Sequence, residues 1–320
     1  MAKPKVAFYW CASCGGCEEA IVDFAEDVLK VVAAVDIVFW PCAMDIKRKD
    51  VEAMPEGSIA VTFINGAVRN SEQEEMVHML RKKSGLIVAF GSCSHLGGIP
   101  ALANLTDKAS ILKKSYSTTF TTVNPDNVYP QEETKVKEGT LTLPKFYDTV
   151  FALDQVIDVD YYLPGCSVPT DLTMSAIMAI LEGKLPPKGT VLSPNKALCE
   201  TCERNKTKPD KLKITKIYRP YEIMIDPEKC FLEQGLICMG PATRTGCGER
   251  CIHANMPCRG CMGPTDQVED QGAKFLSAFA SILDVNDEKD IQKIIDTVAD
   301  PAGTFYRFSV SKSILKGKVH

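Results

Sequence analysis

Residues 86–98, LIVAFGSCSHLGG, join an uninterrupted apolar run to a loop of glycines around one cysteine. A short continuous apolar run is typical of a strand buried on both faces, as in a parallel sheet. Leu86–Gly91 is therefore predicted to be such a strand, and Cys93 follows directly at its carboxyl end. Ligands of open parallel sheets bind beyond the carboxyl ends of the strands, so Cys93 is a candidate binding residue.

Two further predicted strands also end close to cysteines. Residues 5–10 are followed by Cys14 and Cys17, and residues 156–163 are followed by Cys166. These segments lie far apart in the sequence, but the strand ends of one parallel sheet meet along a single edge. We therefore expect one shared site, formed by Cys14, Cys17, Cys93 and Cys166.

Helical segments alternate with these strands. The spacing of the apolar residues predicts the other elements, namely helices over 18–32, 71–83 and 170–181 and strands over 36–40 and 59–64. Ser71 is the expected N-cap of its helix, and Glu74 would complete a capping box. Alternating strands and helices indicate an α/β fold with a parallel sheet, although residues 106–150 show no assignable pattern.

The composition changes after Leu185, where a Pro- and Gly-rich linker begins. Residues 199–261 have little apolar periodicity and are rich in Cys, Gly, Pro and charge, so we expect bound metal to organise them. Residues 271–298 have a mostly helical pattern. We predict an α/β domain over 1–184 and an irregular, metal-binding domain over 185–320.

The chain has 320 residues, of which 45% are hydrophobic, and this length suits about two domains of roughly 100–200 residues each. Its net charge of −4 gives no electrostatic reason to expect nucleic acid or an anionic membrane as a partner. No apolar run is long enough to cross a bilayer, and the N-terminus shows neither a signal-peptide core nor a twin-arginine pair. We expect a soluble, cytoplasmic protein with no membrane span.

Fourteen cysteines stand out in such a chain, and eight of them fall between Cys199 and Cys261. Disulfides are rare in a reducing compartment, so clustered thiols there usually bind metal or carry out redox chemistry. A [4Fe–4S] cluster needs four thiolates and often takes two from a C-x-x-C turn. Such pairs begin at Cys14, Cys199 and Cys258.

Twelve of the cysteines divide into three sets of four. The sets are Cys14, Cys17, Cys93 and Cys166; Cys199, Cys202, Cys230 and Cys238; and Cys247, Cys251, Cys258 and Cys261. Four thiolates at C-x-x-C spacing can bind zinc as well as they bind an iron–sulfur cluster. The alternative is therefore a zinc-stapled interaction protein without redox function. Cys11 and Cys42 are left over and are expected to be small buried hydrophobes, although Cys11 also extends the first pair to C-x-x-C-x-x-C.

Glycines accompany the cysteines of the first set. They allow the backbone to approach a bulky cluster and direct N–H groups at its sulfurs, although ordinary strand-end turns would also use them. These glycines are Gly15, Gly16, Gly91, Gly97, Gly98 and Gly165.

These motifs resemble those of a known family, the small subunits of [NiFe] hydrogenases. The resemblance covers residues 5–265 and is closest to the cytoplasmic F420-non-reducing (methyl-viologen-reducing) group that accompanies heterodisulfide reductase. The matching segments are Cys14-Gly-Gly-Cys17-Glu-Glu, Gly91-Ser-Cys93, Pro164-Gly-Cys166, Cys230-x7-Cys238-Met-Gly-Pro241 and Met256-Pro-Cys258-Arg-Gly-Cys261.

The resemblance implies a flavodoxin-like N-terminal domain with a proximal cluster, and a large partner subunit that holds the nickel–iron site. It assigns the first set of cysteines to the proximal cluster, the second to the distal cluster and Cys247, Cys258 and Cys261 to the medial cluster. Many relatives have a histidine where this chain has Cys199. Cys251 offers the medial cluster a fourth thiolate, so we predict three [4Fe–4S] clusters. They would pass electrons to an iron–sulfur or flavin acceptor subunit, as in a heterodisulfide reductase complex.

Three other features receive predictions. Glu19 matches a family acid implicated in proton movement to the nickel site, so it is a proton-relay candidate; a helix N-terminal acid favoured by the dipole is the alternative. The basic stretch 204–219 is predicted to be a solvated loop, with docking of an acidic acceptor subunit as the alternative. His95 is expected to be a hydrogen-bonded structural histidine.

Two related proteins compete with this interpretation. The 20-kDa-type subunit of complex I should contain the first cysteine set alone, and the eight C-terminal cysteines argue against it. The small subunit of an F420-reducing hydrogenase is harder to separate from sequence.

Overall fold

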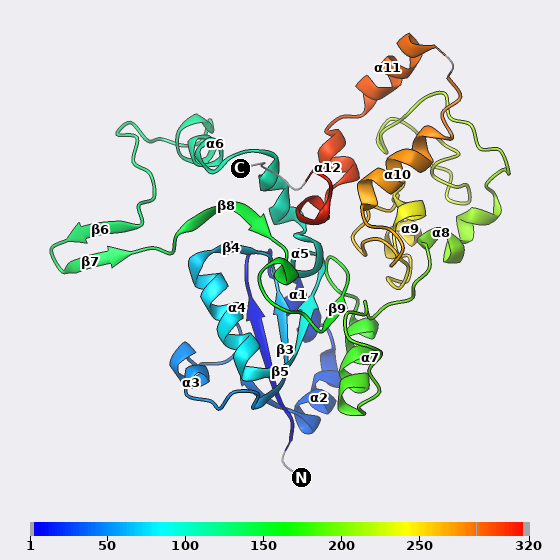
Figure 1. Cartoon of the computed structure of the whole chain (residues 1–320). Helices are drawn as coiled ribbons and strands as arrows, with labels where there is room; N and C mark the ends of the chain where they lie inside the picture. The colour runs from blue at the N-terminus through cyan, green and yellow to red at the C-terminus, as the bar shows by residue number, and fades with distance from the viewer. Residues whose placement is uncertain (1–2, 286, 316–320) are drawn as a thin grey trace.

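The computed structural model of the chain describes residues 3–285 and 287–315. A parallel sheet of order β2-β1-β3-β5-β9 forms the framework of the N-terminal half (Figure 1). Its strands are β1 (Lys5–Trp10), β2 (Asp36–Phe39), β3 (Ile59–Asn65), β5 (Ser84–Phe90) and β9 (Tyr161–Leu163). The predicted α/β class is confirmed, and β1, β5 and β9 end at the same edge.

Two helical layers cover this sheet, because alternate residues of its central strands point to opposite faces. Phe8 and Val88 pack on the layer of α1, α2 and α7, whereas Ala7 and Ile87 pack on the layer of α3 and α4. The helices are α1 (Gly16–Val22), α2 (Val28–Ala34), α3 (Arg48–Glu52), α4 (Ser71–Lys83) and α7 (Thr170–Leu181).

Three local predictions were wrong in detail. The helix expected over 18–32 is split into α1 and α2, because Ala25 takes a φ of 49°, outside the helical region. The N-cap of α4 is Asn70, whose side chain accepts a hydrogen bond from the Gln73 amide, and not Ser71. Strand β9 begins only at Tyr161, because the chain makes a turn at 156 and bends at 157 and 160 after the 3₁₀ helix Leu153–Gln155.

The segment without an assigned pattern, 106–150, forms an excursion from the sheet. It contains α6 (Lys108–Lys113) and a hairpin of β6 (Glu133–Val136) and β7 (Gly139–Thr142), which projects from the body in Figure 1. The segment ends in β8 (Phe146–Phe151), which pairs antiparallel with β4 (Val68–Asn70).

The C-terminal half is irregular around the cysteines and helical after them, as predicted. Its helices are α8 (Leu198–Thr201), α9 (Arg250–His253), α10 (Gln271–Ala280), α11 (Glu288–Thr297) and α12 (Pro301–Phe305). Phe231 and Leu236 share a core with Phe275 of α10 and with Ala101 and Val150 of the N-terminal half. The cysteine-rich segment therefore does not build a core by itself.

The chain returns to the N-terminal half at its end. The Ser311 hydroxyl donates to the Val150 carbonyl at 2.7 Å and lies 3.4 Å from the Asn104 amide nitrogen. The division at residue 184 stays a prediction. In the described ranges, no helix has the length and apolar character needed to cross a membrane.

Candidate metal centres

The proximal group consists of the four cysteines that follow β1, β5 and β9, and the fold brings them together. Cys14 precedes α1 and Cys17 lies within it, Cys93 lies in α5 (Ser92–Leu96), and Cys166 follows β9. Burial raises the pKa of Cys93 to about 12, and the other three thiols of the group add to this effect because they lie close by. Segments far apart in the sequence thus converge on one site.

Two glycines hold this group close to the backbone. A Cβ atom on Gly91, which has a φ of +89°, would lie 2.4 Å from the Cys17 sulfur. A Cβ atom on Gly98 would lie 2.5 Å from the Cys93 sulfur. Only glycine allows this approach, because real Cβ atoms do not come so close to another heavy atom.

The distal group consists of Cys199, Cys202, Cys230 and Cys238. Burial raises the pKa of Cys199 to about 12, and the thiols of Cys238 and Cys230 raise it further. Gly240 lies beside two of these sulfurs, since a Cβ atom there would lie 3.1 Å from the Cys199 sulfur and 3.6 Å from the Cys238 sulfur. The second predicted set is therefore also gathered in space.

The medial group consists of Cys247, Cys251, Cys258 and Cys261. Burial raises the pKa of Cys261 to about 12, and the thiols of Cys247 and Cys251 contribute to this rise. Burial raises the pKa of Cys258 strongly as well, and the thiols of Cys238 in the distal group and of Cys261 add to it, Cys238 more than Cys261. Backbone amides of Glu249 and Gly260 point at sulfurs of this group and act in the opposite direction.

Contacts between neighbouring groups place the three groups in one order. The Cys166 backbone of the proximal group lies beside the Cys261 sulfur of the medial group and lowers its pKa, against the rise caused by burial. The Cys258 amide of the medial group donates to the Cys238 sulfur of the distal group at 3.3 Å. The Ser92 hydroxyl also donates to the Cys261 carbonyl. The medial group therefore lies between the other two.

The donors present fit iron–sulfur clusters. Each group supplies four thiols, and amide N–H groups point at several of the sulfurs, as expected of cluster ligands. Within residues 3–285 and 287–315, no three or more His, Cys, Asp or Glu side chains are grouped to hold a single metal ion.

The two cysteines outside these groups differ from each other. Cys11 is buried in the core beneath α3 and α4, which confirms the prediction of a small hydrophobe. Cys42 is exposed, so the prediction that it is buried was wrong. It lies in the loop after β2 and not within a strand, which explains its exposure.

The acidic pair that follows Cys17 is divided between the surface and the interior. Glu19, the predicted relay residue, lies on the exposed side of α1, whereas Glu18 is buried. The Glu18 carboxylate accepts hydrogen bonds from the Trp40 indole and the Asn65 amide. Burial raises the pKa of Glu18, and these two bonds oppose the rise. The spacing of Glu18 three residues before the buried Ile21 is the sequence signal that could have identified it.

Two side chains differ from expectation near the groups. His95 is buried, and among the described residues its Nδ1 atom has no hydrogen-bond partner, so the prediction of a hydrogen-bonded structural histidine was wrong. Burial lowers the pKa of His95 to about 3. Arg204 is buried rather than solvated, because it stacks on Phe231 and donates to Asn255 at 2.7 Å.

Comparison with known proteins identifies the family. The family model of the NADH ubiquinone oxidoreductase 20 kDa subunit matches residues 14–180. An F420-non-reducing hydrogenase iron-sulfur subunit from Archaeoglobus profundus is 39% identical over 98% of both chains. The chain belongs to this family of F420-non-reducing hydrogenase subunits. A further member, from Methanothermobacter thermautotrophicus, is 37% identical over 99% of this chain and 97% of its own length.

A solved structure supports the fold of this hydrogenase subunit. The [NiFeSe] hydrogenase of Desulfovibrio vulgaris Hildenborough contains a chain with a TM-score of 0.53 and 18% identity, over 82% of this chain and 94% of that one. Membership of this family makes the chain a hydrogenase small subunit and part of an oxidoreductase, and implies a large partner subunit. The match over nearly the full length of the two archaeal relatives also disfavours the complex I alternative.

Proposed function

We propose that the chain carries electrons from a hydrogen-splitting large subunit to an acceptor subunit, through three [4Fe–4S] clusters held by the proximal, medial and distal groups. Such clusters supply one-electron redox chemistry. The acceptor would be an iron–sulfur or flavin subunit of heterodisulfide reductase type, and the complex would be cytoplasmic.

The observation that carries this proposal is the linear order of the three groups. The Cys166 backbone lies beside the Cys261 sulfur, and the Cys258 amide donates to the Cys238 sulfur at 3.3 Å, so each group adjoins the next. A zinc-stapled scaffold has no need of such an order. An electron carrier does, because its centres must be neighbours.

The protein's own residues would hold and tune the clusters. Twelve thiolates would be the iron ligands, and amide N–H groups would stabilise the negative charge on their sulfurs. Burial supports the same role, because it excludes water from Cys238 and Cys258. The fourth medial thiolate, that of Cys251, favours a four-iron over a three-iron cluster.

Glu19 is proposed as a proton relay toward the large subunit. Its exposed side chain on α1 lies two residues after Cys17 and is open to a partner. A carboxylate at such an interface can accept and release a proton as a general acid and base. Glu18 is less suited to this role because both of its oxygens accept bonds from within the chain.

Metal and sulfide analysis tests the proposal. The chain would be purified anaerobically with its large subunit, and iron, acid-labile sulfide and zinc would be measured together with the visible spectrum. We expect about twelve sulfides and about twelve irons per chain beyond the iron of the partner's site. About eleven irons would indicate a three-iron medial cluster, and mostly zinc without visible absorbance would reject the electron-transfer function.

The second candidate is the small subunit of an F420-reducing hydrogenase. The same three groups would serve it equally well, and it differs in the acceptor. Reduction of F420 by the purified complex with hydrogen would favour it, whereas reduction of a heterodisulfide reductase subunit without F420 reduction would favour the first proposal.

A further inference from the structure

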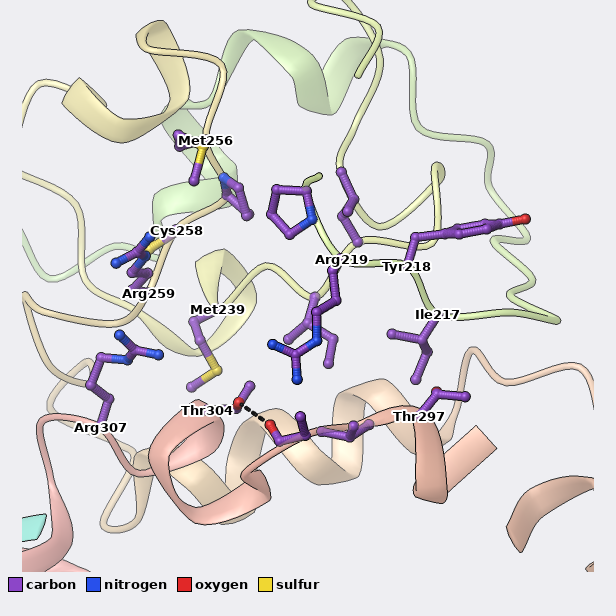
Figure 2. A pocket seen from close by; sticks show the side chains of 16 residues that line it. Ile217, Tyr218, Arg219, Met239, Met256, Cys258, Arg259, Thr297, Thr304 and Arg307 are labelled. Carbon is purple, nitrogen blue, oxygen red and sulfur yellow. Dashed lines mark hydrogen bonds between the residues drawn. The ribbon is translucent and has the colours of Figure 1, made fainter. Parts of the chain in front are cut away.

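A hollow of about 250 Å³ lies in the C-terminal half, and three arginines line it. Figure 2 shows Arg219 and Arg307 on either side of Met239, with Arg259 beside Cys258. The three arginines come from separate segments, between two distal cysteines, between two medial cysteines and after α12. No Asp or Glu is among the lining residues.

This arginine pocket is positively charged. In the part of the chain that the structure describes, none of the three guanidinium groups forms an ion pair. Arg307 donates its Nε–H to the Gly303 carbonyl at 3.0 Å, which orients its guanidinium group. The nearby Glu222 carboxylate accepts a hydrogen bond from the backbone amide of Arg219 and not from its guanidinium group.

Neighbouring basic residues do have partners, which sets the pocket apart. Lys213 pairs with Asp284 at 2.6 Å, and the ammonium group of Lys216 lies over the Tyr218 ring. Like charges that converge in a hollow attract an anion, and guanidinium groups bind carboxylates through paired hydrogen bonds. The pocket therefore favours a carboxylate-bearing ligand.

The location of the pocket indicates the source of that ligand. Cys258 of the medial group is part of the wall, and Met239 follows Cys238 of the distal group. A ligand bound there lies against the medial and distal groups and away from the proximal one. The volume is below the roughly 300–1,000 Å³ typical of pockets that enclose a small-molecule ligand, so it suits the side chains of a protein segment.

We propose that the arginine pocket receives an acidic segment of the protein that accepts electrons from this chain. The acceptor part of this inference rests on the proposed function. The pocket would place acidic side chains on Arg219 and Arg307 and so hold the acceptor next to the medial and distal groups. Rim charges of this kind mainly set association rate and partner choice.

Binding of an acidic probe tests the pocket directly. The complex with the large subunit would be titrated by anaerobic calorimetry at low salt with N-acetyl hexaglutamate amide and, separately, with inorganic phosphate. We expect the peptide to bind more tightly than phosphate. The double variant Arg219→Gln/Arg307→Gln should weaken peptide binding at least about tenfold, because it removes two charge-assisted contacts.

A matched control separates the pocket from general charge. Lys274→Gln/Lys289→Gln removes the same two positive charges from exposed positions on α10 and α11, and should change peptide binding less than about twofold. Iron content and the thermal midpoint must equal those of the wild type in both variants, which excludes misfolding. Unchanged peptide binding in the arginine variant, or phosphate binding as tight as peptide binding, would overturn the inference.

The same samples distinguish the two proposals. Iron and sulfide near the expected values with arginine-insensitive peptide binding would reject the docking pocket and leave the electron-transfer function intact. Absence of iron and sulfide would reject the electron-transfer function, and with it the role of the pocket in holding an acceptor.

Discussion

Residue 91 has no room for a side chain, because a methyl group there would meet the Cys17 sulfur at 2.4 Å on a backbone with a φ of +89°. Gly91→Ala should therefore displace a ligand of the proximal group. We expect the variant to lose about four irons per chain and to lose hydrogen-driven reduction of its acceptor. Iron and sulfide analysis of the purified complex checks this.

Gly57→Ala is the matched control for this substitution. Gly57 also has a positive φ, of +66°, but nothing lies within 4 Å of a Cβ atom there. The control should lose about 1 kcal/mol of stability from backbone strain and keep all of its iron. Equal iron loss in both variants would show that strain, and not contact with the Cys17 sulfur, is responsible.

Cys251 decides the iron content of the medial group. Cys251→Ala leaves three thiols, Cys247, Cys258 and Cys261, which is the ligand number of a three-iron cluster. We expect about one iron fewer per chain, unchanged sulfide and the EPR signal of an oxidised three-iron cluster. The same loss in Cys42→Ala, which removes an exposed cysteine outside the groups, would contradict the assignment.

The spacing of the cysteines was enough to predict the three sets, but the burial and contacts of most individual side chains could not be predicted from the sequence. The strand–cysteine pattern predicted the proximal group, since parallel strands share an edge. Glu18 and Glu19 are adjacent in the sequence, and only the spacing of Glu18 to the apolar Ile21 indicates that helix α1 buries Glu18 and exposes Glu19. Arg259 and Arg307 carry no motif, so their meeting with Arg219 depends on tertiary packing.

At the scale of elements, Asp160 ties the edge strand β9 to its neighbours. Its carboxylate accepts bonds from the Ile87 amide of β5 and from Arg81 of α4, and it pairs with Lys188 of the linker. Burial alone would raise the pKa of Asp160, but these partners outweigh it and hold the pKa below its ordinary value of 3.8. The ionised form is therefore stabilised in the folded chain.

Asp160→Asn should lower the free energy of unfolding by about 2–3 kcal/mol at pH 7. This is less than the roughly 3–5 kcal/mol of a fully buried pair, because Lys188 is mostly exposed. A lowered folded-state pKa adds stability above the ordinary value, and that stability disappears as the pH falls through the folded-state pKa. The difference in the free energy of unfolding between the variant and the wild type should therefore shrink below about pH 3.8.

Urea unfolding at pH 7 and at pH 3 measures this effect. Asp158→Asn is the control, because the Asp158 side chain is exposed and only its carbonyl accepts a bond from Arg81. If Asp160→Asn and the wild type differed by the same free energy of unfolding at both pH values, the stabilisation by Asp160 would not be ionic.

Elements with strong periodicity were predictable, and those set by tertiary contacts were not. Helix α7 follows its apolar spacing over the predicted range, 170–181. The break between α1 and α2 depends on the positive φ of Ala25. Alanine is a good helix former, so its presence in the sequence does not predict a break there. The pairing of β8 with β4 joins segments with little pattern of their own.

At the scale of the whole molecule, the distal group is the end of the proposed path and can be separated from hydrogen chemistry. Cys199→Ala should abolish reduction of the acceptor by hydrogen. Exchange between hydrogen and deuterated water should continue, because that reaction belongs to the large subunit. Cys199→His, the ligand type of many relatives, should restore part of the acceptor reduction. Loss of exchange together with acceptor reduction would contradict an exit role for this group.

The order of the three groups was implied by the family resemblance and not by the spacing of the cysteines. Spacing suggested sets of four, but nothing in it says that Cys261 faces Cys166 or that Cys258 faces Cys238. That order arises because the segment 258–261 packs between the sheet edge and the distal loops, where Ser92 binds the Cys261 carbonyl. The proximity of the groups is a property of the folded chain.

The close approach of the Cys166 backbone to the Cys261 sulfur, and the hydrogen bond from the Cys258 amide to the Cys238 sulfur, have a consequence for redox titration. With a cluster on each group, as we propose, a peptide unit anchored to one cluster polarises a ligand of the next. An added electron on either side then alters the midpoint potential of its neighbour, as in any set of coupled titrating sites. The three clusters would therefore titrate anticooperatively, because reduction of one cluster lowers the midpoint potential of its neighbour. A substitution that shifts the potential of one cluster would also shift those of the others.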